Sequence, residues 1–189
     1  MHRSLLKAAV CGGIIAFVWC WLSWTVLPIH NCCIHSFTHP SKVASVVKDN
    51  APASGMYVLP YTFGYNENSS QEDMKRAIAM MDHGPFMFAA VLPNGMQHTH
   101  KQAMAIGLII DIIGAFLAAW LLSHAQGLAF RQKVLFVALF GLAVGVLTYL
   151  PAWNWIGFPG NFVLTQIFDL VIAWTLAGLA MAKIIKKVR

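Results

Sequence analysis

Four long apolar stretches constrain the fold of this chain more than any other feature. They cover residues 5–27, 103–123, 134–150 and 161–184. At a rise of about 1.5 Å per residue, a helix of each length crosses a hydrocarbon core of roughly 30 Å, although the third is short. Charged residues make up 11% of the chain, against about a quarter in a soluble domain. We therefore predict an all-α integral membrane protein built on a four-helix transmembrane bundle.

The first stretch has features of both a signal peptide and a membrane anchor. It starts with the basic residues Arg3 and Lys7, as signal peptides do. Its apolar run is about twice the usual signal length, and no small-residue cleavage site follows. Trp19, Trp21 and Trp24 are typical of an aromatic belt at a membrane interface. We expect an anchor that is not cleaved.

Basic residues flank the apolar stretches on one side of a four-span topology. They are Arg3, Lys7, Arg131, Lys133, Lys183, Lys186, Lys187 and Arg189. The positive-inside rule assigns that side to the cytoplasm, so both termini are predicted inside and the loops 28–102 and 151–160 outside. The net charge of +6 follows from this topology. No basic patch interleaved with aromatic residues indicates nucleic acid as a partner.

Two sequence similarities indicate a duplicated helical hairpin. The pattern Thr-x-Leu-Pro occurs at 25–28 and again at 148–151, and "DIIGAFLAAW" (111–120) aligns with "DLVIAWTLAG" (169–178). Both similarities occur in the same order, which predicts parallel repeats related by an axis along the membrane normal. The alternative is chance recurrence of Leu, Ala and Phe in membrane helices.

The first hairpin carries a long insertion, so the chain divides into three parts. They are 1–27 (cytoplasmic N-terminus and first span), 28–102 (extracytoplasmic α/β insertion) and 103–189 (three further spans and a cytoplasmic tail). Within the insertion we predict helices over 41–50 and 70–82, strands over 55–59 and 85–92, and a polar loop over 61–71. Ser70 and Asp73 have the spacing of a capping box. A unit this small can hardly bury a core alone, so we expect it against the outer mouth of the bundle.

Two carboxylates inside apolar stretches are the strongest functional candidates. Asp111 and Asp169 each lie about eight residues from the outer end of their span, roughly 12 Å deep. An ionised carboxylate there costs at least about 2.5 kcal/mol. No Lys, Arg or His occurs at that depth, so no basic partner is expected for either. The functional interpretation is an intramembrane polar core with Thr165 and Gln166 that relays a proton or cation or binds a substrate. The alternative is structural: protonated acids that bond Thr165, Gln166 or backbone carbonyls.

A cluster of histidines and cysteines follows the first stretch. Its candidate metal ligands are His30, Cys32, Cys33, His35, His98 and His100, with His39 and Met96 nearby. Imidazole, thiolate and thioether groups suit zinc or copper, so either metal is the cofactor that this interpretation implies. The spacing matches no standard structural zinc site. The alternative is that these side chains have only structural roles at the membrane surface.

No enzyme signature accompanies these residues. The sequence contains no P-loop, GxSxG, HExxH or dinucleotide-binding fingerprint. The runs "LPIHNCCIHSF", "NAPASGMYVLP", "PAWNWIGFPGNFVL" and "DLVIAWTLAGLAMAKI" resemble uncharacterised four-helix bacterial inner-membrane proteins. The resemblance implies the same four-helix arrangement and a location in the bacterial inner membrane, and it implies no activity. This chain has Ile29 where that pattern has a tryptophan, and its cysteine pair also departs from the pattern.

Three functions follow from these observations. The favoured one is a non-enzymatic transport or accessory component of the inner membrane with an intramembrane Asp pair. The alternatives are a metal-binding protein of the outer face and a membrane enzyme that acts on a lipid-like substrate. The predicted partners are the lipid bilayer and either a second copy of the chain or another membrane protein.

Overall fold

The computed structural model describes residues 2–62, 69–125 and 127–185. These residues form two compact units. Of the described residues, the first unit contains 2–35, 98–125, 127–154 and 158–185, and the second contains 36–62, 69–97 and 155–157. The predicted division at 27 and 102 stays a prediction, and residues 28–35 fall in the first unit.

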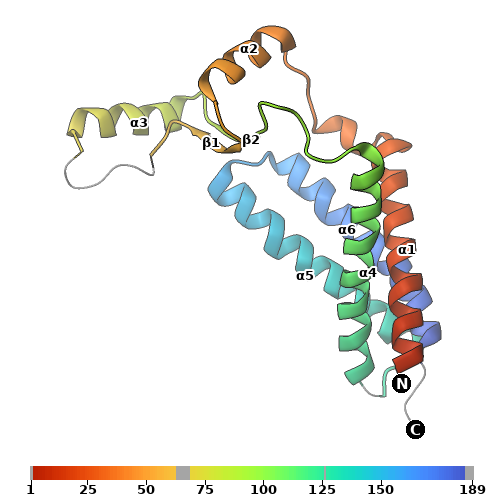
Figure 1. Ribbon diagram of the computed structural model, residues 1–189. Coiled ribbons are helices and arrows are strands. Elements are labelled where there is room, and N and C mark those ends of the chain that lie inside the picture. The colour runs from red at the N-terminus through yellow and green to blue at the C-terminus, as the bar shows by residue number, and fades with distance from the viewer. Residues whose placement is uncertain (1, 63–68, 126, 186–189) are drawn as a thin grey trace. The chain divides into compact units, whose positions relative to one another are not determined.

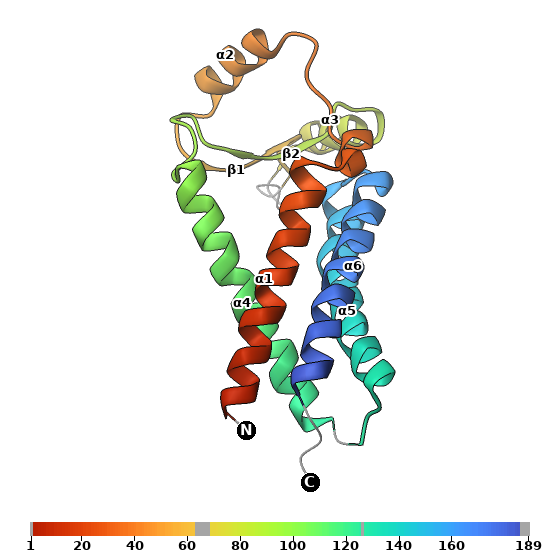
Figure 2. The same ribbon diagram turned by 90° about the vertical axis from the view of Figure 1, so that its right-hand side faces the viewer.

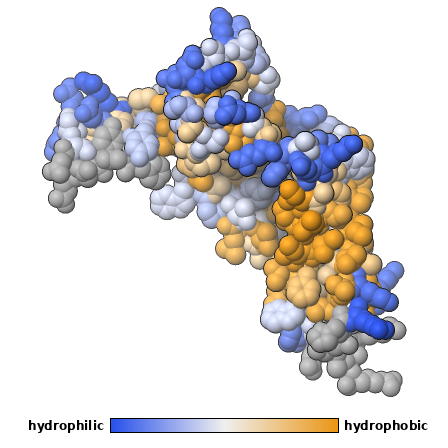
Figure 3. All heavy atoms as spheres, viewed as in Figure 1, coloured by the Kyte–Doolittle hydropathy of each residue, from blue (hydrophilic) through white to orange (hydrophobic). Residues whose placement is uncertain are grey.

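Four helices of the first unit are long and apolar enough to cross a membrane, counted over the described residues. They are α1 (His2–Thr25), α4 (His100–His124), α5 (Phe130–Ile156) and α6 (Gly160–Ile184). In Figures 1 and 2, α1 runs beside both α4 and α6. On the side seen in Figure 3, a continuous apolar surface covers α4 and the neighbouring α1. The four predicted spans therefore correspond to four helices that could cross a membrane by their length and composition.

The helix ends differ from prediction where proline and capping decide them. The third span continues through Pro151, which lies inside α5, to Ile156. Helix α4 begins three residues early because Thr99 and Gln102 form a capping box. Asn161, the first residue of the fourth apolar stretch, lies inside α6, which begins at Gly160 and has Pro159 as its N-cap.

Glycines let the helices of the first unit approach closely. A Cβ atom built on Gly13 of α1 would lie 2.6 Å from the Ile112 Cα atom of α4. A Cβ atom on Gly141 of α5 would lie 2.6 Å from the Trp174 Cβ atom of α6. Such distances exclude a side chain, so these positions set the helix spacing.

One end of the bundle gathers basic residues. The start of α1, the start of α5 and the end of α6 lie together there (Figure 2). Lys133, whose side chain is buried, donates from Nζ to the Ile185 carbonyl oxygen at 2.6 Å. A lysine in this position satisfies a carbonyl at the end of α6 and complements the negative end of the helix dipole. Of the basic residues predicted on this side, Lys186, Lys187 and Arg189 lie outside the described residues.

The second unit has the elements predicted for the insertion. They are α2 (Pro40–Asn50), β1 (Gly55–Leu59), α3 (Gln71–His83) and β2 (Met87–Val91). The strands pair antiparallel with Gly55 opposite Val91. Ser70 caps α3 by accepting from the backbone N–H groups of Glu72 and Asp73. The central part of the predicted loop, 63–68, lies outside the described residues.

The second unit has a sparse core. Ala51 and Ala77 are buried, whereas Met56, Tyr61 and Ile78 each expose more than half of their surface. This agrees with the expectation that a unit of this size buries little apolar surface by itself.

Candidate functional site

The candidate site forms where the chain turns back at the end of α1. The helix ends at Thr25, and the backbone N–H groups of Val26 and Leu27 both bond the Leu22 carbonyl oxygen at 2.9 Å. Pro28 has no N–H group to continue the ladder and instead starts the 3₁₀ turn η1 (Pro28–Cys32). The turn directs His30 back against Ser23, seven residues earlier.

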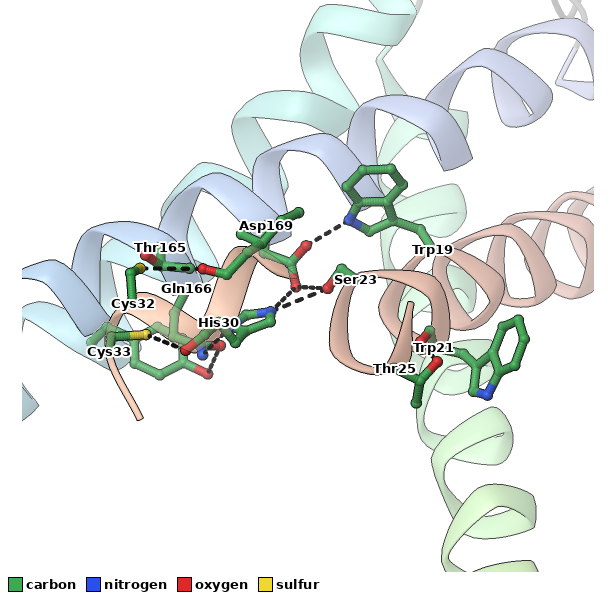
Figure 4. Close-up of polar contacts among 12 residues, drawn as sticks. Trp19, Trp21, Ser23, Thr25, His30, Cys32, Cys33, Thr165, Gln166 and Asp169 are labelled. Atoms are coloured by element: carbon green, nitrogen blue, oxygen red, sulfur yellow. Dashed lines mark hydrogen bonds and ion pairs between the residues drawn. The ribbon is translucent and has the colours of Figure 1, made fainter. Parts of the chain in front are cut away.

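Asp169 of α6 accepts from α1 through both carboxylate oxygens. The Trp19 Nε1–H group donates to Oδ1 at 2.7 Å, and the Ser23 hydroxyl donates to Oδ2 at 2.8 Å. His30 Nε2 lies 3.6 Å from the same Oδ2 atom. Figure 4 shows the carboxylate between these three side chains. An ionised carboxylate only accepts hydrogen bonds, so this ring of donors suits the charged form of Asp169.

The other ring nitrogen of His30, Nδ1, contacts Gln166, which lies one turn before Asp169 on α6. Gln166 Nε2 lies 3.4 Å from His30 Nδ1. The Tyr149 hydroxyl of α5 donates to Gln166 Oε1 at 3.4 Å. The imidazole thus links Gln166 and Tyr149 on one side to Ser23 and Asp169 on the other. The complete network draws side chains from α1, η1, α5 and α6.

The centre of this network is buried. Ser23, His30, Gln166 and Asp169 have relative exposures of 0%, 4%, 5% and 6%. The Trp24 ring covers His30 by stacking, with ring centroids 3.9 Å apart and an angle of 13° between planes. A stacked indole stabilises an imidazolium through its negative π face. Burial and stacking therefore hold a titratable pair in a dry site.

Further contacts hold η1 against α6. Asn161 Nδ2 donates to the Cys32 carbonyl oxygen at 3.1 Å. The His30 carbonyl accepts from both the backbone N–H and the thiol of Cys33. Burial of Cys33, with the neighbouring Cys32 thiol as a smaller cause, raises the pKa of its thiol. Both cysteines therefore contribute to the position of His30, one through its carbonyl and one through its thiol.

The described hydrogen bonds between α1 and α6 involve Asp169 and not Asp111, and the Asp111–Asp169 pair stays a prediction. Asp111 of α4 is half-buried, and its side chain has no hydrogen bond or ion pair among the described residues. Thr165 donates to the Asn161 carbonyl of its own helix at 2.8 Å. Of the four predicted core residues, Asp169 and Gln166 meet, through His30.

The expectation that Asp169 has no basic partner is wrong, because His30 is that partner. His30 lies beyond the first apolar stretch in the sequence, so it was not expected at the depth of Asp169, but η1 folds it back into the helix bundle. Ser23 and Trp19 were not predicted as site residues, because serine and tryptophan are ordinary residues of a membrane helix. Trp19 and Trp24 contact Asp169 and His30, while the exposed Trp21 points away from the site (Figure 4).

The predicted metal ligands differ in their burial. His30 and Cys33 are buried in the network, whereas Cys32, His35, His98 and His100 are exposed. The described part of the chain contains no group of three or more His, Cys, Asp or Glu side chains that could hold a metal ion. Zinc or copper binding stays a prediction, without a preformed centre behind it.

Serine, histidine and aspartate together raise the question of nucleophilic catalysis. In a catalytic triad the carboxylate bonds the imidazole nitrogen opposite the one that faces serine. Here Ser23 Oγ and Asp169 Oδ2 both face His30 Nε2, and the serine hydroxyl donates to the carboxylate. Ser23 is also fully buried, so no substrate reaches it. The arrangement suits holding a proton, and it does not suit acyl transfer.

Comparison with protein-family models, curated proteins and solved structures finds no match for this chain.

Proposed function

We propose that this small polytopic membrane protein is a non-enzymatic component of a proton-linked transport process, with His30 and Asp169 as its proton-holding pair. The observation that carries the proposal is the buried contact of 3.6 Å between His30 Nε2 and Asp169 Oδ2. Histidine is the side chain whose ordinary titration falls between about pH 5 and pH 8. A titratable pair inside a membrane-spanning bundle is typical of proton relays.

The surroundings of the pair support proton exchange over simple helix adhesion. Helix adhesion needs only one or two hydrogen bonds, which Trp19 and Ser23 already supply to Asp169. The imidazole adds a group that can change its charge, together with a stacked indole that favours the charged form. The pair can therefore consist of a neutral His30 beside the Asp169 carboxylate or of a protonated His30 beside it, without any rearrangement of α1 and α6.

The placement of the site follows from the same proposal. With the basic end of the bundle at the cytoplasm of a bacterial inner membrane, both termini are cytoplasmic. His30 then enters the bundle from the outer side, through the turn that follows α1. A proton from the outer compartment meets His30 before it meets Asp169. The bilayer is one partner, and a second copy or another membrane protein is the other.

Proteoliposomes with a trapped pH-sensitive dye test the proposal. Wild-type protein is expected to dissipate a pH gradient faster than protein-free vesicles, at a clamped membrane potential. Asp169→Asn and His30→Gln are expected to reduce the rate to that of protein-free vesicles. Asp111→Asn is the matched control, since Asp111 has no hydrogen-bond or ion-pair partner among the described residues, and it is expected to retain the flux. A wild-type rate equal to that of empty vesicles, or unaffected His30 and Asp169 variants, would overturn the proposal.

A further inference from the structure

An apolar groove lies where α5 and α6 approach their connecting turn, outside the network of His30 and Asp169. It has a volume of about 260 Å³ and is lined by Leu150, Trp153, Gly160, Val163 and Leu164. Val163 is 2% exposed and forms the floor, whereas Trp153 and Leu164 expose more than half of their surface at the rim. The groove is therefore open on one side and closed below.

The groove depends on the missing side chain at Gly160. A Cβ atom built on this residue would lie 4.0 Å from the Trp153 Nε1 atom and would meet nothing closer. The φ angle of Gly160 is not positive, so its backbone conformation does not require glycine. Glycine at this position leaves space open beside Trp153, and a larger side chain would fill that space.

Water is a poor occupant of this groove. None of the residues that the structure describes in its lining is charged, and the indole N–H of Trp153 is their one polar side-chain group. A bound water needs two to four polar partners, and apolar cavities stay dry. An empty groove would lose dispersion contacts along its lining, which a hydrocarbon chain restores.

The groove opens onto the surface that faces the hydrocarbon core. Leu147, one turn deeper on α5, is 75% exposed, and Phe168, one turn deeper on α6, is 67% exposed. Both helices are long and apolar enough to cross a membrane. The lining is thus continuous with the lipid-facing surface of two spans, where the surrounding molecules are lipid chains.

We propose that this groove binds one acyl chain of a bilayer phospholipid, along the part of the chain close to its ester group. The volume lies below the roughly 300–1,000 Å³ of pockets for drug-sized ligands, and it suits a segment of a single flexible chain. The depth follows from the spans, because Leu150 ends the third apolar stretch and Val163 lies in the first turn of α6.

Trp153 supplies the polar end of the site. Tryptophan is enriched at the level of the lipid head groups, where its ring is apolar and its N–H group can bond. The Trp153 Nε1–H group has no hydrogen-bond partner among the described residues, so it can donate to an ester carbonyl oxygen of the bound lipid. Because no described lining residue is basic, recognition depends on the chain and not on the charge of the head group.

Photocrosslinking in vesicles tests the proposal. Full-length protein is reconstituted into phosphatidylcholine vesicles that contain a small fraction of phosphatidylcholine with a diazirine on the acyl chain, near the ester. The crosslinked residues are then mapped by mass spectrometry. We expect Val163 and Leu164 to be labelled at least about threefold more than the exposed Leu147, which corresponds to about 0.7 kcal/mol of preference.

Filling the groove supplies the second measurement. Gly160→Leu is expected to lower the labelling of Val163 and Leu164 to that of Leu147. The matched control is Ala143→Leu, which adds a leucine to the exposed surface of α5 outside the groove lining and should leave the labelling unchanged. If Gly160→Leu does not fold, Leu150→Trp fills the groove from α5 and replaces it.

Three results would overturn the proposal. The first is wild-type labelling in the groove no stronger than at Leu147, as expected if a second copy or another protein covers it. The second is unchanged labelling after the groove is filled. The third is labelling that depends on the head group when phosphatidylglycerol with the same chain replaces the probe. None of these results bears on the proton-holding pair, because the groove shares no residue with it.

Discussion

The hydrogen bond between Trp19 and Asp169 gives the sharpest test of the described geometry. The N···O distance of 2.7 Å is at the short end for a charge-assisted bond. Hydrogen bonds to charged groups contribute about 1.5–3 kcal/mol in soluble proteins, whereas interhelical bonds in membranes average about 0.6 and reach about 1.7 kcal/mol. Because the bond is short and its acceptor is buried, we expect a coupling energy near the upper membrane value, about 1–2 kcal/mol.

A double-mutant cycle isolates that energy from the loss of ring volume. Its members are the wild type, Trp19→Phe, Asp169→Leu and the double variant, unfolded reversibly by SDS in mixed micelles. Asp169→Asn replaces the leucine variant if that protein does not fold, with a correspondingly smaller coupling. The matched control is Trp21→Phe, because Trp21 is exposed and points away from Asp169 (Figure 4).

For the control cycle we expect additivity within about 0.3–0.5 kcal/mol. A Trp19 coupling no larger than that of Trp21 would refute the bond between α1 and α6. Such a result would also remove the support for an ionised Asp169, because that support depends on the donors around the carboxylate.

Three further predictions concern the bundle and its outer turn. With the thiols of α1 replaced by serine, Cys32 should react with iodoacetamide faster than Cys33. Because the pKa of the Cys33 thiol is raised, Cys33 carries less thiolate near neutral pH, and its reaction rate should keep rising at alkaline pH. Equal rates for the two cysteines at all pH values would contradict this prediction. Lys133→Met should lower the free energy of unfolding by about 1–3 kcal/mol by leaving a carbonyl at the end of α6 unsatisfied, and an unchanged SDS midpoint would count against the cap. Gly141→Ala should destabilise by about 1–3 kcal/mol through overpacking, whereas Gly107→Ala, with ordinary van der Waals room, should be tolerated; similar costs for both would contradict the packing.

Periodicity and turn chemistry predicted most of the elements. Apolar length alone located the four spans, since the backbone in lipid has few alternatives to a helix. Strand β1 has the predicted bounds, and Ser70 caps α3 as its spacing indicates. The main error in a helix end came at Pro151, where the helix continues although proline removes one hydrogen bond.

The site was only half predictable. Depth in an apolar stretch singled out Asp169, and the helical spacing of one turn placed Gln166 beside it. His30 was assigned to a metal cluster because its neighbours in sequence are cysteines and histidines. Its position depends on a tertiary event, the return of the chain through η1, that no local pattern encodes. The Thr-x-Leu-Pro motif marks the place of that turn, and whether it also marks a duplication stays a prediction.

Proton counting tests the central claim most directly. Potentiometric titration of the purified protein between about pH 8 and about pH 5 measures the protons that it binds. Compared with His30→Gln, the wild type should bind one more proton over this range. Superimposable curves for wild type and His30→Gln would contradict the account, because a pair that binds no proton cannot carry one.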